Sequence, residues 1–319
     1  MANTPTIHPQ SSIFHPRCVL IAGPTAVGKS EIALSLAEQL GGEIVSADSM
    51  QVYRGLEIGT AKPSPADRAR VPHHLIDILD LNESFDAAQF VRHAQQAVAE
   101  IQARGHVPVF CGGTGLYFKA FLEGLGEAPP ADAKVRAELE AMPMESLLAE
   151  LRERDPATYE KIDRKNPRRV IRALEVIRLT GKPFSAQRSE WKPGVRSQKP
   201  EAGFFCFTRS SSDLHARINI RVDAMFKRGL VAEAQHLLQH GLAENKTAMQ
   251  AIGYRQVVEY LRGERSLPET IELVKIRTRQ FAKRQLTWFR AQKNLQWIEL
   301  EPDEPLDKII KGLRSRFQD

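Results

Sequence analysis

Short apolar runs alternate with amphipathic stretches over the first third of the chain. Residues 18–22, 43–46 and 107–111 are mainly apolar and short, so each predicts a buried strand. Residues 30–40 and 87–105 repeat apolar positions every three to four residues and run into glycine, which predicts helices. Strands that alternate with helices in this way predict a parallel sheet with helices on its faces.

The pattern becomes helical after residue 122. A Gly- and Pro-rich segment precedes a wholly helical pattern over residues 133–181, which is followed by an irregular stretch to residue 202. Residues 203–209 again predict a strand, residues 212–238 predict one long helix, and further helices are expected to the end of the chain. The expected division is a flexible tail at 1–16, a core at 17–122 and 203–319 with a helical C-terminal part, and an all-helical insertion domain at 123–202.

The segment between the first predicted strand and the first predicted helix carries a phosphate-binding motif. The sequence GPTAVGKS matches G-x-x-x-x-G-K-[ST] in full, so we expect an α/β fold of the P-loop NTPase-like type. Backbone N–H groups of such a loop point at one anion, and the following helix adds the positive end of its dipole. The motif indicates phosphates but not the compound that carries them. Its residues are Gly23, Pro24, Thr25, Ala26, Val27, Gly28, Lys29 and Ser30.

Two further polar segments follow predicted strands at their carboxyl ends, where parallel sheets bind ligands. Asp48 follows the second strand and could ligate a metal ion, cap a helix or act as a general base. The turn CGGTGLY follows the third strand and offers backbone N–H groups and the Thr114 hydroxyl. An ordinary turn between a strand and a helix would have the same sequence features.

Charge is unevenly distributed along a chain whose net charge is +6. Residues 275–293 contain seven Lys or Arg side chains and no acidic residue, whereas a surface helix normally mixes both signs. This segment predicts contact with a polyanion, although a solvated basic helix is the alternative.

Composition argues against several classes of protein. Cys18, Cys111 and Cys206 lie far apart with no CxxC pair, which argues against a disulfide framework or a zinc site. His73 and His74 are adjacent and would point to opposite faces of a strand, so they are not expected to bind one ion. No run of about 18 apolar residues and no signal-peptide pattern occurs, so we expect a cytoplasmic protein.

Seven motifs, in this order, resemble those of the bacterial tRNA dimethylallyltransferases, also called tRNA isopentenyltransferases or IPP transferases. The resemblance spans residues 18–292, and the set of motifs is specific where the glycine loop alone would not be. The motifs are GPTAVGKS, SADSMQVYRGLEIGTAKP, VPHHLIDILD, CGGTGLYFKAF, NPRRVIRALEV, AIGYRQ and RTRQFAKRQLTWFR.

The resemblance implies an activity and assigns roles within it. The family transfers a dimethylallyl group from dimethylallyl diphosphate to the exocyclic N6 amine of the adenosine 3′-adjacent to the anticodon of tRNA. The glycine loop would then hold the diphosphate with Mg²⁺ at Ser30 and Asp48, Asp48 would be the general base, and Lys29 and Thr114 would assist catalysis. Arg217 and Arg221 share one helix face and either reach the diphosphate or form a surface pair with Asp213 or Asp223.

The resemblance also implies a tRNA-binding surface on a protein that we expect to be a monomer. Arginines at helical spacing with apolar residues behind them suit an insertion that clamps RNA. The residues matched to tRNA contacts are Asp48, Ser49, Met50, Gln51, Thr114, Arg136, Arg168, Arg169, Val170, Ile171, Arg172, Gln250, Ala251, Ile252, Gly253, Tyr254, Arg255, Arg277, Arg279, Lys283 and Arg284.

Three other functions stay open at this point. An adenylate isopentenyltransferase would share the loop and the chemistry but would modify a free nucleotide, which requires neither the insertion nor the basic segment. A small-molecule kinase would use the loop to bind ATP. An RNA-binding protein without activity would leave the glycine loop and Asp48 without a purpose.

Overall fold

The computed structural model describes residues 18–125, 129–187 and 203–318. The chain divides into two compact units, one of Met1–Leu122 with Gln198–Asp319 and one of Glu123–Ser197. The tail predicted at 1–16 and most of the irregular stretch before residue 203 lie outside the described residues.

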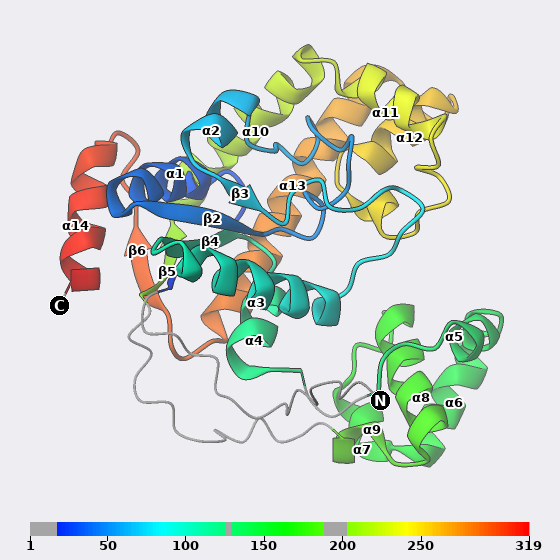
Figure 1. Ribbon diagram of the computed structural model, residues 1–319. Coiled ribbons are helices and arrows are strands. Elements are labelled where there is room, and N and C mark those ends of the chain that lie inside the picture. The colour runs from blue at the N-terminus through cyan, green and yellow to red at the C-terminus, as the bar shows by residue number, and fades with distance from the viewer. Residues whose placement is uncertain (1–17, 126–128, 188–202, 319) are drawn as a thin grey trace, which may run out of the picture. The chain divides into compact units, whose positions relative to one another are not determined.

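A six-stranded sheet forms the centre of the larger unit, and all its pairings are parallel (Figure 1). The strand order is β3-β2-β4-β1-β5-β6. The strands are β1 (Val19–Ala22), β2 (Gly42–Ala47), β3 (His73–His74), β4 (Val107–Gly112), β5 (Phe204–Thr208) and β6 (Gln296–Glu299). The predicted α/β fold with a parallel sheet is therefore confirmed.

Helices of the larger unit cover both faces of this sheet. Val19 and Ile21 of β1 belong to the core on the α1 side, whereas Leu20 and Ala22 belong to the core on the α3 side. This alternation explains why β1 is apolar at every position. The helices are α1 (Lys29–Leu40), α2 (Pro65–Arg70), α3 (Ala87–Ala103), α4 (Gly115–Glu123), α10 (Ser211–Lys227), α11 (Leu230–Leu238), the 3-10 helix η1 (Ala248–Gln250), α12 (Tyr254–Leu261), α13 (Leu267–Arg290) and α14 (Leu306–Gln318).

Two predictions for the C-terminal part are wrong. The single helix predicted at 212–238 is two helices, α10 and α11, because Gly229 adopts a left-handed φ of 101° between them. The strand β6 was expected to be part of a helix. This strand lies at the edge of the sheet beside β5, and most of its residues are exposed. An exposed edge strand does not need the apolar run of a central strand, so its sequence contains no strand signal.

The smaller unit is helical, as the pattern predicts. A shared apolar core includes Leu139, Leu151, Val170 and Leu174. The longest of its helices begins at an Asn166 cap followed by proline, a common helix start. The helices are α5 (Ala133–Glu140), α6 (Met144–Arg154), α7 (Pro156–Lys161), α8 (Pro167–Thr180) and α9 (Phe184–Gln187).

Candidate active site

The phosphate-binding motif forms the loop between β1 and α1, where the sequence places it. A Cβ atom on Gly23 would lie 2.8 Å from the carbonyl oxygen of Phe207, so only glycine fits there. Gly28 is the N-cap of α1 at a left-handed φ of 107°. Ala26 also has a left-handed φ, of 65°, which strains a residue with a side chain. The loop therefore needs support from neighbouring elements.

Two arginines outside the motif provide part of this support. The Nε atom of Arg217 donates a hydrogen bond of 3.0 Å to the carbonyl oxygen of Ala26. The Nε atom of Arg209 donates one of 2.8 Å to the carbonyl oxygen of Val27. Because these bonds hold the loop in place, little free energy has to be spent on ordering it when an anion binds.

A cavity of about 400 Å³ lies beside the loop. It adjoins the first turn of α1, whose N–H groups and dipole favour an anion. Arg217 and Arg221 contribute to its wall from α10 together with the loop, which is the arrangement that a diphosphate site requires. The lining residues are Ala26, Gly28, Lys29, Ser30, Glu31, Arg217, Ile220 and Arg221.

The alternative surface role for the two arginines of α10 is not what the structure forms. Asp213 binds Arg209, with 2.9 Å between Oδ2 and Nη1. Asp223 binds Lys275, with 2.8 Å between Oδ1 and Nζ. The carboxylates that could have formed the surface pair are thus engaged elsewhere.

The cations of this cavity form a concentration of positive charge. Burial lowers the pKa of the Lys29 ammonium; Arg221 adds to this effect, while Cys111 and Asp48 oppose it. Burial also lowers the pKa of Arg221, and Asp48 again opposes the shift. A bound diphosphate would compensate both buried cations.

Asp48 directly follows β2 and is half-buried. Its Oδ1 atom accepts a hydrogen bond of 2.9 Å from the N–H of Met50, so the segment forms a turn. No helix begins at this described position, and the helix-cap interpretation is therefore wrong. The carboxylate is left to serve as a base or as a metal ligand.

Thr114 lies next to Asp48 through the second glycine turn. The Oγ1 atom of Thr114 accepts a hydrogen bond of 3.2 Å from the N–H of Ser49, and its own N–H donates to Ala47 at 3.2 Å. A Cβ atom on Gly112 would lie 2.2 Å from the carbonyl oxygen of Ala47. The turn after β4 is thus packed directly against the turn that carries Asp48.

A second cavity, of about 350 Å³, contains both Asp48 and Thr114. Its wall combines these polar groups with apolar side chains, as a site for an apolar group and a base requires. Arg221 lines this cavity as well as the one beside the loop, so the two adjoin at Arg221. The lining residues are Thr25, Asp48, Ser49, Met50, Gly59, Thr60, Thr114, Arg221, Val222, Met225, Gln250, Ala251, Ile252, Val274, Thr278, Phe281 and Arg284.

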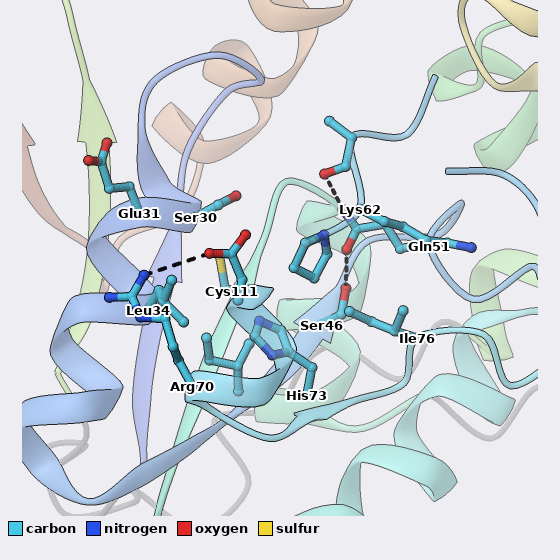
Figure 2. A pocket seen from close by; sticks show the side chains of 14 residues that line it. Ser30, Glu31, Leu34, Ser46, Gln51, Lys62, Arg70, His73, Ile76 and Cys111 are labelled. Atoms are coloured by element: carbon cyan, nitrogen blue, oxygen red, sulfur yellow. Dashed lines mark hydrogen bonds and ion pairs between the residues drawn. The ribbon is translucent and has the colours of Figure 1, made fainter. Parts of the chain in front are cut away.

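Gln51 does not line that second cavity. Its Oε1 atom accepts a hydrogen bond of 2.9 Å from Ser46, and its Nε2 atom donates to the carbonyl oxygens of Thr60 and Ala61 at 3.3 and 3.4 Å. It borders a third cavity, of about 390 Å³, with Ser30 on the opposite wall (Figure 2). The side chain therefore holds the loop after β2 together. Its contact with tRNA stays a prediction.

The predicted magnesium ligands do not share a cavity wall. Ser30 borders the cavity beside the loop and Asp48 borders the second cavity. The described part of the chain contains no cluster of three or more His, Cys, Asp or Glu side chains that could hold a metal ion. Mg²⁺ in proteins often takes few side-chain ligands and several phosphate oxygens, so the Ser30 hydroxyl beside the loop suits a diphosphate-bound ion.

His73, His74 and the three cysteines contact or lie among other parts of the fold. His74 contacts Glu43, with 2.6 Å between Nε2 and Oε2, whereas the Nδ1 atom of His73 contacts the carbonyl oxygen of Val71 at 2.7 Å. The rings thus have different partners, as predicted. Burial raises the pKa of all three thiols, to about 12, 11 and 12 for Cys18, Cys111 and Cys206.

The predicted tRNA contacts on the helical unit separate into two groups. Arg136 and Arg172 each contact the fully buried carboxylate of Glu175 at 2.8 Å, so they stabilise the unit itself. Val170 and Ile171 are buried in the core of the unit, whereas Arg168 and Arg169 are exposed. Among the predicted contacts on this unit, Arg168 and Arg169 are therefore the most exposed.

The predicted contacts at residues 250–255, around the start of α12, separate in the same way. Tyr254 is fully buried, and its hydroxyl donates to Glu233 at 2.6 Å and accepts from the N–H of Gly59 at 3.1 Å. Ala251 and Gly253 are also buried, whereas Gln250 and Arg255 are exposed. The tyrosine therefore supports the wall of the second cavity from behind.

The basic segment begins within α13, at Lys275, and continues past the end of the helix to Lys293. Arg277, Lys283 and Arg284 are exposed, whereas Arg279 contacts Glu272 and Asn219 at 3.0 and 2.7 Å. Arg284 also borders the second cavity, so the exposed charge continues to the entrance of the candidate active site.

Two residues hold the site through contacts that the sequence did not indicate. Arg209 supports the loop, and Gln285 of α13 bonds to both the loop and the second glycine turn. Gln285 lies within a conspicuous motif, but nothing in the motif shows that its amide points inward.

The profile of the IPP transferase family matches residues 51–292 of the chain. A tRNA dimethylallyltransferase of Halorhodospira halophila is 50% identical over 285 residues, which cover 85% of this chain and 89% of the relative. The tRNA dimethylallyltransferase 1 of Trichlorobacter lovleyi is 47% identical over 287 residues, with 89% and 93% covered.

Solved structures give the same result. The tRNA isopentenylpyrophosphate transferase of Bacillus halodurans superimposes with a TM-score of 0.69 at 39% identity, covering 95% of this chain and 97% of that one. A eukaryotic dimethylallyltransferase acting on tRNA gives a TM-score of 0.73 at 29% identity, with 88% and 73% covered.

Proposed function

The chain belongs to the IPP transferase family, and we propose that the cavity beside its phosphate loop and the cavity lined by Asp48 together transfer a dimethylallyl group to tRNA. Its substrates are dimethylallyl diphosphate and tRNA. We assign the acceptor as the exocyclic N6 amine of the adenosine 3′-adjacent to the anticodon. One observation supports the proposal most directly: Arg221 borders both the cavity beside the phosphate loop and the cavity lined by Asp48.

The donor binds with its diphosphate beside the loop. Backbone N–H groups of the loop and the first turn of α1 face the phosphate oxygens, while Lys29, Arg217 and Arg221 neutralise their charge. The dimethylallyl group then extends past Arg221 into the second cavity, where Val222 and Met225 provide an apolar wall.

The acceptor adenine belongs to the tRNA, and it enters the second cavity. A base in an anticodon loop has to leave its stack to reach such a site. Phe281 and Arg284 of α13 border this cavity, and their side chains suit stacking on a base and contact with its phosphate. Asp48 and Thr114 then lie beside the amine.

Transfer exchanges one bond for another at the allylic carbon. The bond from this carbon to the diphosphate oxygen breaks, and its electrons leave with the diphosphate. The N6 nitrogen forms the new bond to carbon and loses one proton, which the Asp48 carboxylate accepts. The products are N6-isopentenyladenosine in tRNA and free diphosphate.

The departing diphosphate is the group that needs stabilisation in this step. Negative charge grows on its bridging oxygen, and fixed cations and N–H groups lower the barrier because they need no rearrangement. Mg²⁺ held by the phosphate oxygens and the Ser30 hydroxyl would add a further positive charge. Lys29 and Arg221 supply the protein's own share.

Each of the two units presents exposed basic side chains of its own that would contact tRNA phosphates. Arg277 and Lys283 lie on the same helix as Arg284, and Arg168 and Arg169 begin α8. Phosphate contacts of this kind position RNA and make its binding dependent on salt. We expect a cytoplasmic monomer to be the active species.

A transfer assay tests this function. The purified protein is incubated with radiolabelled dimethylallyl diphosphate and Mg²⁺, together with unmodified tRNA or with free AMP. We expect label in tRNA and not in AMP. Label in AMP alone, or phosphoryl transfer from ATP to an acceptor in a parallel reaction, would contradict the proposal.

A further inference from the structure

Gln285 connects two loops of the active site through one side chain. It lies on α13 and is 7% exposed. Its Oε1 atom accepts a hydrogen bond of 2.8 Å from the N–H of Thr25 in the phosphate loop. Its Nε2 atom donates one of 2.9 Å to the carbonyl oxygen of Gly113. The amide thus uses its acceptor for one loop and its donor for the other.

One of these loops faces the diphosphate leaving group, and the other lies beside the proposed general base, Asp48. Thr25 lies within the loop that faces the diphosphate, and it also borders the second cavity. Gly113 precedes Thr114, whose hydroxyl accepts from the N–H of Ser49 beside Asp48. The sheet fixes the strand ends from which these loops start, and beyond those ends the amide of Gln285 bridges the loop at the leaving group and the turn beside the base.

The contact leaves little freedom for movement. A Cβ atom on Gly113 would lie 2.1 Å from the Nε2 atom of Gln285, and one on Gly115 would lie 2.1 Å from the ring of Trp288. The glycine turn can approach α13 so closely only because both positions lack side chains. Gln285 and Trp288, one helical turn apart, hold the turn in place.

We propose that Gln285 is a positioning residue for the transfer reaction, because its amide sets the distance between the diphosphate loop and the Thr114–Asp48 side of the site. An amine attacks the allylic carbon only along a narrow line, and a displacement of about 1 Å can reduce a rate by roughly 100-fold. This inference rests on the proposed function, since it concerns the same two cavities.

The first test replaces the amide by a side chain of similar length. Gln285→Met keeps the volume but removes both hydrogen bonds, so the loops lose their fixed spacing. We expect kcat to fall about 10- to 100-fold. KM for both substrates should stay within about threefold, because the basic side chains that bind each substrate are unchanged in this variant. Gln96→Met on α3, which replaces an exposed glutamine that donates to Glu100, is the control and should match the wild type.

The second test uses pH to restore the bonds. In Gln285→Glu a neutral carboxyl group can accept from Thr25 and donate to Gly113, as the amide does, whereas the ionised group would repel the carbonyl oxygen of Gly113. Burial beside that oxygen raises the pKa of the introduced group. The ratio of the variant's rate to the wild-type rate should therefore rise as pH is lowered from about 8 to about 5.

The outcomes separate the inference from the function on which it rests. Thermal unfolding verifies that each variant is folded. A folded Gln285→Met protein with wild-type kcat, a loss confined to KM, or a rate ratio for Gln285→Glu that does not change with pH would each refute the role of Gln285. A wild-type chain that transfers no dimethylallyl group would instead remove the proposed function.

Discussion

At the scale of single residues, Asp48 occupies a turn that its own carboxylate helps to form. Its Oδ1 atom accepts a hydrogen bond from the Met50 N–H. The carboxylate also interacts electrostatically with the buried cations Lys29 and Arg221. A carboxylate with one oxygen engaged can still accept a proton on the other. The general-base role therefore requires no rearrangement of the turn.

Replacement of Asp48 by asparagine should separate binding from chemistry. Asp48→Asn keeps the acceptor for Met50 but cannot take a proton, so we expect kcat to fall about 100- to 10,000-fold. The affinity for tRNA, measured by filter binding, should stay within about threefold. A rate close to that of the wild type would remove Asp48 as the base.

Glu43 shows how a buried charge makes stability depend on pH. The carboxylate is buried between β2, β3 and the end of α3, and the hydrogen bond from Arg104 lowers its pKa to about 2, with help from His74 and His106. Its stabilising effect is complete above the pKa of the unfolded chain, near 4.5. That effect is lost as pH falls from about 4.5 towards about 2.

Glu43→Gln should therefore lower the free energy of unfolding at neutral pH. We expect a loss of about 2–3 kcal/mol, since Arg104 and His106 are half exposed and water weakens the interaction. Chemical denaturation at about pH 7 and at about pH 3 measures the effect. A difference between variant and wild type that is equal at both pH values would refute the assignment of this pKa.

At the scale of elements, α13 serves two purposes on different sides. Gln285 and Phe289 face the interior, whereas Arg277 and Lys283 face solvent. The basic segment could be recognised from the sequence because residues 275–293 contain seven Lys or Arg side chains and no acidic residue. The inward-directed hydrogen bonds of Gln285 could not be recognised, because the polarity of a side chain does not show whether it points into the protein or into solvent.

Removal of two charges from α13 should weaken the binding of tRNA. For Arg277→Gln with Lys283→Gln we expect KM for tRNA to rise about tenfold and the salt dependence of binding between about 50 and 200 mM to become less steep. KM for dimethylallyl diphosphate should not change. The same substitutions at Lys311 and Arg316 of α14 are the control, and an equal effect there would assign the result to net charge.

Local signals explain which elements could be predicted. The glycine loop and the strands β1, β2 and β4 follow from sequence over a few neighbouring residues. The edge strand β6 could not be predicted in this way, because its pairing with β5 depends on residues about 90 positions earlier.

At the scale of the whole molecule, the site depends on contacts between distant parts of the chain. Gln285 bonds to a loop residue 260 positions away, and Arg209 bonds to one 182 positions away. The sequence predicts the loop and Asp48 because their chemistry is local. It does not predict the side chains that hold them, since only the fold brings these together.

A crystal structure with a thiolodiphosphate analogue of the donor, which resists transfer, tests the central claim most directly. We predict that the diphosphate lies against the loop, within hydrogen-bonding distance of Lys29 and at least one of Arg217 and Arg221. The dimethylallyl group should extend into the cavity that contains Asp48. A diphosphate bound away from Lys29, or a dimethylallyl group directed away from Asp48, would contradict the account.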